Sequence, residues 1–283
     1  MHPLIYNVDN GQLLKQLAKN EYPSVVVSAL LNPVFLKLKT NEWKTILKNA
    51  AKSNSVLIRQ AAAQHPSIYN VDKGETLRNL SKNEHSFDVQ INAIRHPNLH
   101  RIDGGSYMTG LTKRPLHFAR KGLARNPHIL KIPNGEETMR KLATNEDGNI
   151  RRYVASNPAV IEINKGSLLR KLAKTNNKYI QMGAAENPRI HELNQGGVMK
   201  ELAYSRHLWA EHAATTAPQF HRIYRGATLR DYMQNNKKAN FNKSIVARKA
   251  QKAKYNPLVM SRLAAVLRAH VGNNLANHFN TVL

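Results

Sequence analysis

Nine of the 12 prolines in this chain recur at a nearly fixed interval of about 31 residues. The series is Pro3, Pro33, Pro66, Pro97, Pro127, Pro158, Pro188, Pro218 and Pro257. Each of them follows Asn or His except Pro218, which follows an alanine. A fixed period of this size is the signature of stacked repeats, in which a unit buries its apolar face only against its neighbours. The spacing therefore predicts an elongated array of roughly eight units instead of one compact core.

One unit, residues 157–186, shows the local signals most clearly. Asn157-Pro158 predicts a helix start, because the Asn side chain caps the first turn and proline lacks an N–H that would be unpaired there anyway. A short turn over 159–163 then leads to Lys165-Gly166, which predicts a stop and a re-entry into helix.

The rest of this unit predicts two helices. Leucines at helical spacing predict the first over 167–174, here named helix A, and Asn176-Asn177 ends it. The second, helix B, is predicted over 179–186, directly before the next Asn-Pro pair. The sequence thus predicts an all-α fold, an α-solenoid of roughly eight ~31-residue helical repeats.

Small or aliphatic residues occupy one helix B position in every unit, four residues before each proline. They are Ala29, Ala62, Ala93, Leu123, Val154, Ala184, Ala214 and Ala253. We expect this position to let successive B helices approach closely. Since no single unit has enough apolar surface to fold alone, stacking must supply the core.

Two segments resemble a known repeat family. Residues 150–158, IRRYVASNP, are followed by a Leu-x-x-Leu-Ala step, and 58–66 match nearly as well. This pattern resembles the VRxxxAxNP…LxxLA motif of the variant leucine-rich repeat proteins, over roughly residues 1–218. The resemblance implies a superhelix related to HEAT-like solenoids. The unit here is longer than that family's shorter consensus, and the cysteines proposed to hold an iron–sulfur cluster are absent, so that cofactor is not implied.

The repeat pattern weakens after Asp231, and no acidic residue occurs from position 232 to the end. We therefore predict a solenoid over 1–231 and a basic insertion with a C-terminal capping helix over 232–283. Four cations of this C-terminal part are predicted to bind nucleic acid: Lys237, Lys238, Arg248 and Lys249.

The chain is strongly cationic, with 43 Lys and Arg against 18 Asp and Glu, a formal net charge of +25 and a pI near 10.4. Solubility ordinarily needs a net charge of only about 2–8. A charge this large favours anionic partners by steering and counterion release. It predicts a non-enzymatic protein that binds DNA, RNA or another polyanion, and a scaffold or inhibitor that binds an acidic protein remains an alternative.

A cation recurs two residues before the leucine of the helix A Leu-Ala step, with Lys44 at the matching place in the second unit. This helix A column comprises Lys15, Lys44, Arg78, Arg140, Arg170, Lys200 and Arg230, and Thr109 interrupts it. Because packed helices lie about 8–10 Å apart, the column predicts a ladder of charge that follows a phosphate backbone. The alternative is that Lys and Arg are simply good helix formers on a solvated face, copied by duplication.

A second set of cations lies seven and six residues before the prolines, in helix B. This helix B column comprises Arg59, Arg120, Lys121, Arg151 and Arg152. It is cationic in the middle of the array only. If B helices line the binding face, the central units carry its most positive region.

The sequence offers little support for catalysis. The chain has no cysteine, which excludes disulfides, thiolate metal sites and cysteine nucleophiles, and we expect no cofactor or metal. A HEAT-like DNA glycosylase is a third hypothesis, for which Trp43, Trp209 and Glu211 are the only candidate residues. No apolar stretch reaches the ~18 residues of a membrane span, and no signal peptide is evident. We expect a protein of the cytoplasm of a bacterial or phage-infected cell.

Overall fold

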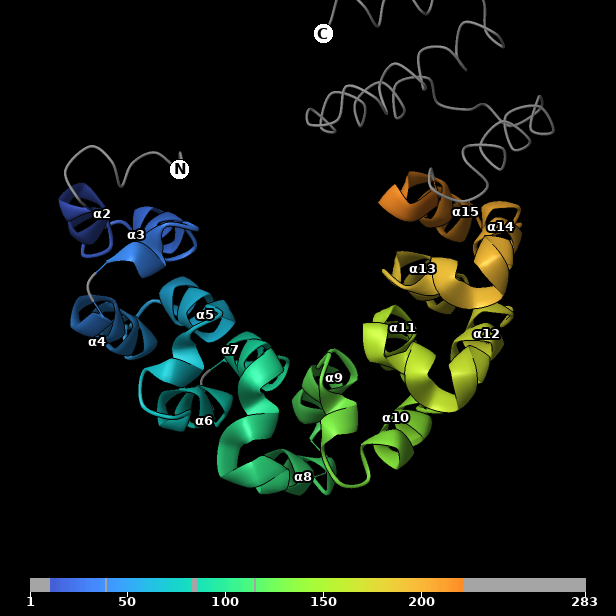
Figure 1. Cartoon of the computed structure of the whole chain (residues 1–283), viewed down its shortest axis with the longest axis horizontal. Coiled ribbons are helices and arrows are strands. Elements are labelled where there is room, and N and C mark those ends of the chain that lie inside the picture. Colours follow the sequence, from blue (N-terminus) through green and yellow to red (C-terminus); the bar gives the residue numbers. More distant parts are fainter. Residues whose placement is uncertain (1–10, 39, 83–85, 115, 221–283) are drawn as a thin grey trace, which may run out of the picture. The chain divides into compact units, whose positions relative to one another are not determined.

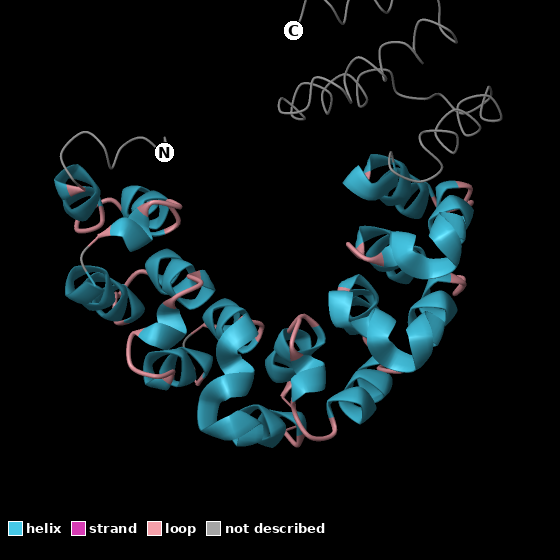
Figure 2. Ribbon diagram, viewed as in Figure 1, coloured by secondary structure: helices cyan, strands magenta, loops and turns pink. Residues whose placement is uncertain are grey.

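The computed structural model describes residues 11–38, 40–82, 86–114 and 116–220. These residues form helices and connecting turns, and no strand occurs among them (Figure 2). The chain divides into two compact units, Met1–Thr175 and Asn176–Leu283. None of the described helices is long and apolar enough to cross a bilayer.

Within the first unit, A and B helices alternate along the chain. The A helices are α2 (Gln12–Leu17), α4 (Thr40–Ala51), α6 (Glu75–Ser81), α8 (Ser106–Thr112), α10 (Gly135–Ala143) and α12 (Ser167–Ala173). The B helices are α3 (Pro23–Leu30), α5 (Val56–Gln64), α7 (Phe87–Ile94), α9 (His117–Ala124) and α11 (Gly148–Ser156). Short 3-10 helices follow the B helices: η2 (Phe35–Lys37), η3 (Ile68–Asn70), η4 (Pro97–Gly105), η5 (Ile129–Lys131) and η6 (Pro158–Gly166).

The second unit continues the same order of elements. It contains the B helix α13 (Lys178–Glu186), the 3-10 helix η7 (Ile190–Gly196), the A helix α14 (Gly197–Ala203) and the B helix α15 (Leu208–Thr216). Within it, α13 and α14 both pack against α15.

The helix predictions for residues 157–186 are confirmed. Helix A was predicted over 167–174 and is Ser167–Ala173 with Lys174 as its C-cap, and helix B begins one residue earlier than predicted, at Lys178. The predicted turn after Pro158 is a kinked 3-10 helix. Gly166 ends it with a left-handed φ of 80°, the conformation that favours glycine at this re-entry point.

Successive B helices of the first unit pack directly against each other. The contacts run from α3 to α5, α7, α9 and α11 in turn, and each A helix from α2 to α10 also packs against the B helix that follows it. Figure 1 shows these B helices side by side in one row, which we name the B row. The helices α4, α6, α8 and α10 form a second row, which we name the A row. The residue four before each proline lies inside this packing, since Ala29, Ala62, Ala93, Leu123 and Val154 are at most 1% exposed. The predicted role of this position is confirmed.

Gly122 lies at a close contact between α9 and α7. A Cβ added to it would lie 2.5 Å from Cβ of Ile94, on the preceding B helix. A side chain at this position would therefore force α9 away from α7.

The Asn or His before the repeat prolines is buried throughout the described chain, and at three of these positions its side chain connects two repeats. In the first compact unit, Met1–Thr175, these residues include His65, His96, Asn126 and Asn157, and we name these four the rung residues. The Oδ1 atom of Asn157 accepts a hydrogen bond from the Ala159 N–H at 2.9 Å, which is the predicted helix-start cap. Its Nδ2 group also donates to the carbonyls of Ala124 and Asn126, 2.9 and 2.8 Å away in the preceding unit.

Asn126 repeats this arrangement one unit earlier, with Nδ2 donating to the carbonyls of Ile94 and His96 at 2.8 and 2.9 Å. His96 follows the same plan with an imidazole. Its Nδ1 accepts from the Asn98 N–H at 3.1 Å, so Nε2 carries the proton and donates to the His65 carbonyl at 3.1 Å. Burial lowers the pKa of His96 to about 4. The rungs therefore join successive units through buried, uncharged hydrogen bonds.

Several predictions for the C-terminal part lie outside the described residues. They are the boundary near residue 231, the eighth repeat with Arg230, the basic insertion and capping helix over 232–283, and the binding residues Lys237, Lys238, Arg248 and Lys249.

Candidate functional site

Two members of the helix A column form ion pairs with residues of the following repeat. The Lys15 Nζ atom lies 2.8 Å from Glu42 Oε1, which joins α2 to α4. The Arg78 Nη2 atom lies 2.6 Å from Asp103 Oδ2, which joins α6 to η4. These cations connect neighbouring repeats, and their charge is compensated.

The other described members of the column are also half-buried. Arg140 pairs with Glu136 on its own helix at 2.7 Å, and Lys44 Nζ lies 5.8 Å from the ring centre of Trp43. Arg170 lies on α12 and Lys200 on α14, in the second unit. At least three of the described column residues, Lys15, Arg78 and Arg140, thus have a carboxylate partner.

Three arginines of the helix B column share one position, seven residues before the proline. Arg59, Arg120 and Arg151 are half-buried there. Arg59 donates through Nη1 to the Ser53 carbonyl at 2.5 Å, which ties the start of the B helix to the loop after α4. Its Nε and that of Arg151 are buried and make no hydrogen bond within the described residues. This position contributes at least in part to packing.

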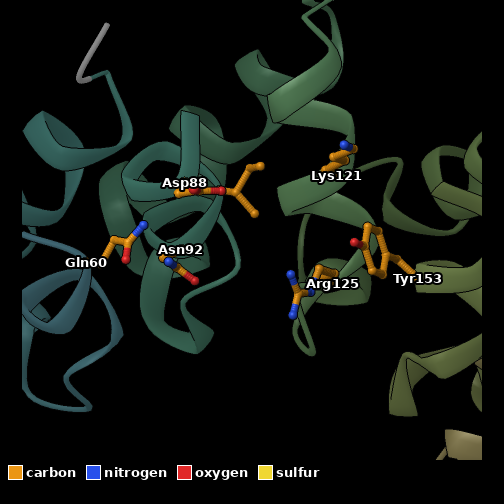
Figure 3. A pocket seen from close by; sticks show the side chains of 7 residues that line it. Gln60, Asp88, Asn92, Lys121, Arg125 and Tyr153 are labelled. Carbon is orange, nitrogen blue, oxygen red and sulfur yellow. The ribbon is translucent and has the colours of Figure 1, made fainter. Parts of the chain in front are cut away.

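The next position of the B helix, six residues before the proline, lines a pocket. The pocket has a volume of about 310 Å³ and is lined by Gln60, Asp88, Ile91, Asn92, Lys121, Arg125 and Tyr153, and we name it the basic pocket (Figure 3). These residues come from four consecutive B helices, α5 to α11, with Arg125 at the C-cap of α9. Lys121 is the helix B column residue at this site, whereas Arg152 is half-buried elsewhere on α11.

Arg125 and Arg95 are site residues that the sequence columns do not include. Both are C-caps of B helices, two residues before a repeat proline in neighbouring units. The guanidinium carbon of Arg125 lies 4.8 Å from the ring centre of Tyr153, a cation–π contact that orients it (Figure 3). Burial, followed by the charge of Arg125, lowers the pKa of Arg95. The two guanidinium groups therefore repel each other in a partly desolvated place.

No ion pair involves Arg95, Lys121 or Arg125 in the described part of the chain. The pocket contains one acid, Asp88, which is exposed. With Arg95 interacting with Arg125 and Asp147 interacting with Lys121, the site has three cations and two carboxylates, so its net charge is positive. Amide groups of Gln60 and Asn92 complete a lining suited to an anion.

The residues considered for catalysis belong to different units. Trp43 is buried in the first unit, and Trp209 is exposed on α15 of the second. No group of three or more potential metal ligands occurs among the described residues.

Comparisons with known proteins identify no family. No protein-family model matches the chain, and no curated protein matches it significantly. A similar solved structure is the crystal structure of an engineered protein from the Northeast Structural Genomics Consortium. It is 15% identical, with 98% of this chain and 88% of that chain covered and a TM-score of 0.39. A likeness of this size supports no conclusion about fold or function.

Proposed function

We propose that this protein is a non-enzymatic nucleic-acid-binding α-solenoid, and that the basic pocket and its neighbours on the B row contact the phosphate backbone. The observation that carries the proposal is that Lys121 and Arg125 line one pocket, that the charge of Arg125 acts on Arg95 of the preceding repeat, and that none of the three forms an ion pair among the described residues. Guanidinium and ammonium groups arranged in this way bind phosphate oxygens by charge-assisted hydrogen bonds.

The solenoid part of the proposal is supported by the repeat in both sequence and contacts. The order of 3-10 helix, A helix and B helix recurs along the described chain, and in the first unit each B helix packs on the next. In such an array one residue position recurs at a regular spacing, which suits a polymer with a regular charge.

The net charge of +25 supports the choice of a polyanion. Pocket side chains that reach phosphates give affinity and position but no base specificity. We therefore assign the class of ligand, a nucleic acid, and no preferred sequence.

The experiment is a salt titration of the purified full chain. Its affinity for fluorescent 20-mers of DNA and RNA is measured by anisotropy between 50 and 300 mM NaCl, with poly-glutamate as competitor. We expect submicromolar binding at low salt and a log–log slope of about −0.9 for each phosphate neutralised on duplex DNA. Absence of binding at 50 mM NaCl, a slope near zero, or full displacement by poly-glutamate at equal charge would overturn the proposal, and the last result would favour an acidic protein partner.

A further inference from the structure

Exposed apolar side chains gather at the start of the B helices. Eight of the 11 large exposed hydrophobic residues in the described chain occupy the N-cap or the first two positions of a B helix. They are Tyr22, Val56, Leu57, Phe87, Leu116, Tyr179, Leu208 and Trp209. Single exposed apolar residues are ordinary, but their return at one structural position marks an interaction surface. We name this position the B-helix entry.

In the first unit the B-helix entry carries a pair of phenylalanines. Phe87 of α7 is 67% exposed and stacks on Phe118 of α9, with ring centres 5.8 Å apart and planes inclined by 23°. A pair of nearly parallel rings on the surface offers an aromatic face to solvent.

Exposed lysines precede three of these entries in the sequence. Lys52, Lys82 and Lys113 follow or cap the A helices α4, α6 and α8, one short loop before a B-helix entry. A cation at this place also interacts favourably with the carbonyl end of the A helix, which is reason enough for a lysine there. The helix dipole does not account for the exposed apolar side chains that follow in the sequence, and the two features together suit a ligand with both apolar faces and negative charge.

The second unit has the same combination. Tyr179 of α13 and Trp209 of α15 both occupy the second position of their helices and are 46% and 57% exposed. Lys178 Nζ lies 5.0 Å from the Tyr179 ring centre. Arg206 and His207, just before α15, share the Asn176 side-chain oxygen as hydrogen-bond acceptor.

We infer that the B-helix entries bind single-stranded nucleic acid by stacking of unpaired bases on the aromatic rings, while the neighbouring lysines contact its phosphates. This inference rests on the proposed nucleic-acid binding and narrows it to one form of the ligand. In a duplex the base faces are covered by their neighbours, so only an unpaired strand can offer them to exposed rings. Stacking tolerates any base, because every base has a π face.

The charge pattern favours this ligand over a lipid surface. Inserting into a bilayer would bury the entries, yet exposed Asp88 directly follows Phe87 and Asn149 occupies the entry of α11. Burying a carboxylate in the apolar part of a bilayer is costly, whereas a strand that stacks on the rings leaves Asp88 in water.

Trp209 provides a direct probe, since Trp43, the second tryptophan of the chain, is only 8% exposed. The full chain is titrated with dT20, with a 20-bp duplex and with vesicles containing phosphatidylserine, and tryptophan emission and affinity are recorded. The variants are Phe87→Ala, Trp209→Ala and Trp209→Phe, with Leu36→Ala as control, because Leu36 is 44% exposed but lies in η2.

We expect dT20 to quench Trp209 and each alanine variant at a ring to lose roughly 5- to 100-fold in affinity for dT20. Duplex affinity should stay unchanged, Trp209→Phe should retain most of the single-strand affinity, and Leu36→Ala should behave as the wild type. Unchanged dT20 affinity in both alanine variants overturns the inference but leaves salt-dependent nucleic-acid binding intact. A response of Trp209 to vesicles without a response to dT20 also overturns it. If the wild-type chain binds neither dT20 nor the duplex, the proposed function itself is wrong.

Discussion

The two rows of helices in the first unit are joined by different chemistry. Between A-row elements, successive units are linked by ion pairs at the surface, Lys15 with Glu42 and Arg78 with Asp103. In the B row they are linked mainly by buried contacts, namely the small residues of the helix interfaces and the rung hydrogen bonds. One exposed pair also occurs there, His117 Nε2 with Asp147 Oδ2 at 2.6 Å, between α9 and the start of α11. Ion pairs therefore join the repeats in the A row, whereas the B row is joined mostly by uncharged contacts.

This difference has a consequence for both stability and binding. An exposed ion pair contributes about 0–1 kcal/mol, while a buried hydrogen bond contributes about 0.5–1.5 kcal/mol and costs more when one partner is lost. The B row should therefore carry most of the stability between units. Among the described residues its cations Arg95, Lys121 and Arg125 form no ion pair, which is the basis of the proposed binding.

The largest effect on stability should come from acid acting on the two histidine rungs. Burial, together with the charge of His96, lowers the pKa of His65 to about 4, and burial does the same for His96. Between pH 6.5 and 4 the unfolded chain binds protons that the folded chain rejects, so stability is complete above about pH 7 and falls as the pH decreases through this window. The loss near pH 5 should be on the order of 2 kcal/mol for each histidine.

The measurement is urea unfolding between pH 4.5 and 8, with His65→Asn and His96→Asn as variants. Asparagine is the rung residue of the later units and does not titrate, so both variants should flatten the pH profile. An unchanged profile in the double variant would show that the acid sensitivity arises elsewhere.

A methyl group in the B row should also be costly. Gly122→Ala places its Cβ against Ile94 and should destabilise the protein by about 1–3 kcal/mol despite the better helix propensity of alanine. The matched change in the A row is Gly110→Ala in α8, where nothing lies within 4 Å of the added Cβ. It should stabilise by about 0.5–1 kcal/mol. Thermal unfolding of the two variants measures both signs, and equal effects would refute the distinction between the rows.

The smallest effect should come from an A-row ion pair. Asp103→Asn keeps a residue type that tolerates the left-handed φ of 50° at this position and removes the charge that faces Arg78. Chemical unfolding should show a loss below about 1 kcal/mol that shrinks further in 0.5 M NaCl. Glu137→Gln, which removes the partner of Lys141 within one helix, is the control and should cost still less. A loss above 2 kcal/mol for Asp103→Asn would mean that the A row also carries major stability.

The sequence predicted the local fold well because its signals are local. Proline with a preceding Asn, a glycine at the re-entry and leucines at helical spacing determine α12 and α13 to within one residue. The second half of the rung interaction was missed, since the carbonyls that accept from Asn157 lie in the preceding unit. Such an interaction becomes visible only when two units are placed side by side.

The candidate site was predicted less well, because a column of cations does not show which charges are compensated. Glu42 and Asp103 lie 27 and 25 residues after the cations that they pair with, outside any helical spacing rule. Arg95 and Arg125 escaped notice because only two units carry a cation at that position. The sequence signal for this site is that each of these arginines lies two residues before a repeat proline.

A comparison of two triple variants tests the central claim most directly. One replaces Arg95, Lys121 and Arg125 by glutamine, and the other replaces Lys15, Arg78 and Arg140, so both remove three positive charges from the first unit. With folding checked by circular dichroism, we expect the B-row variant to lose at least about 10-fold in affinity for nucleic acid, with a salt slope lower by up to ~2.7 on duplex DNA. The A-row variant should lose less than about 3-fold, since its cations are already paired. Equal losses would mean that net charge alone governs binding, and a larger loss in the A-row variant would contradict the assignment of the B row as the binding face.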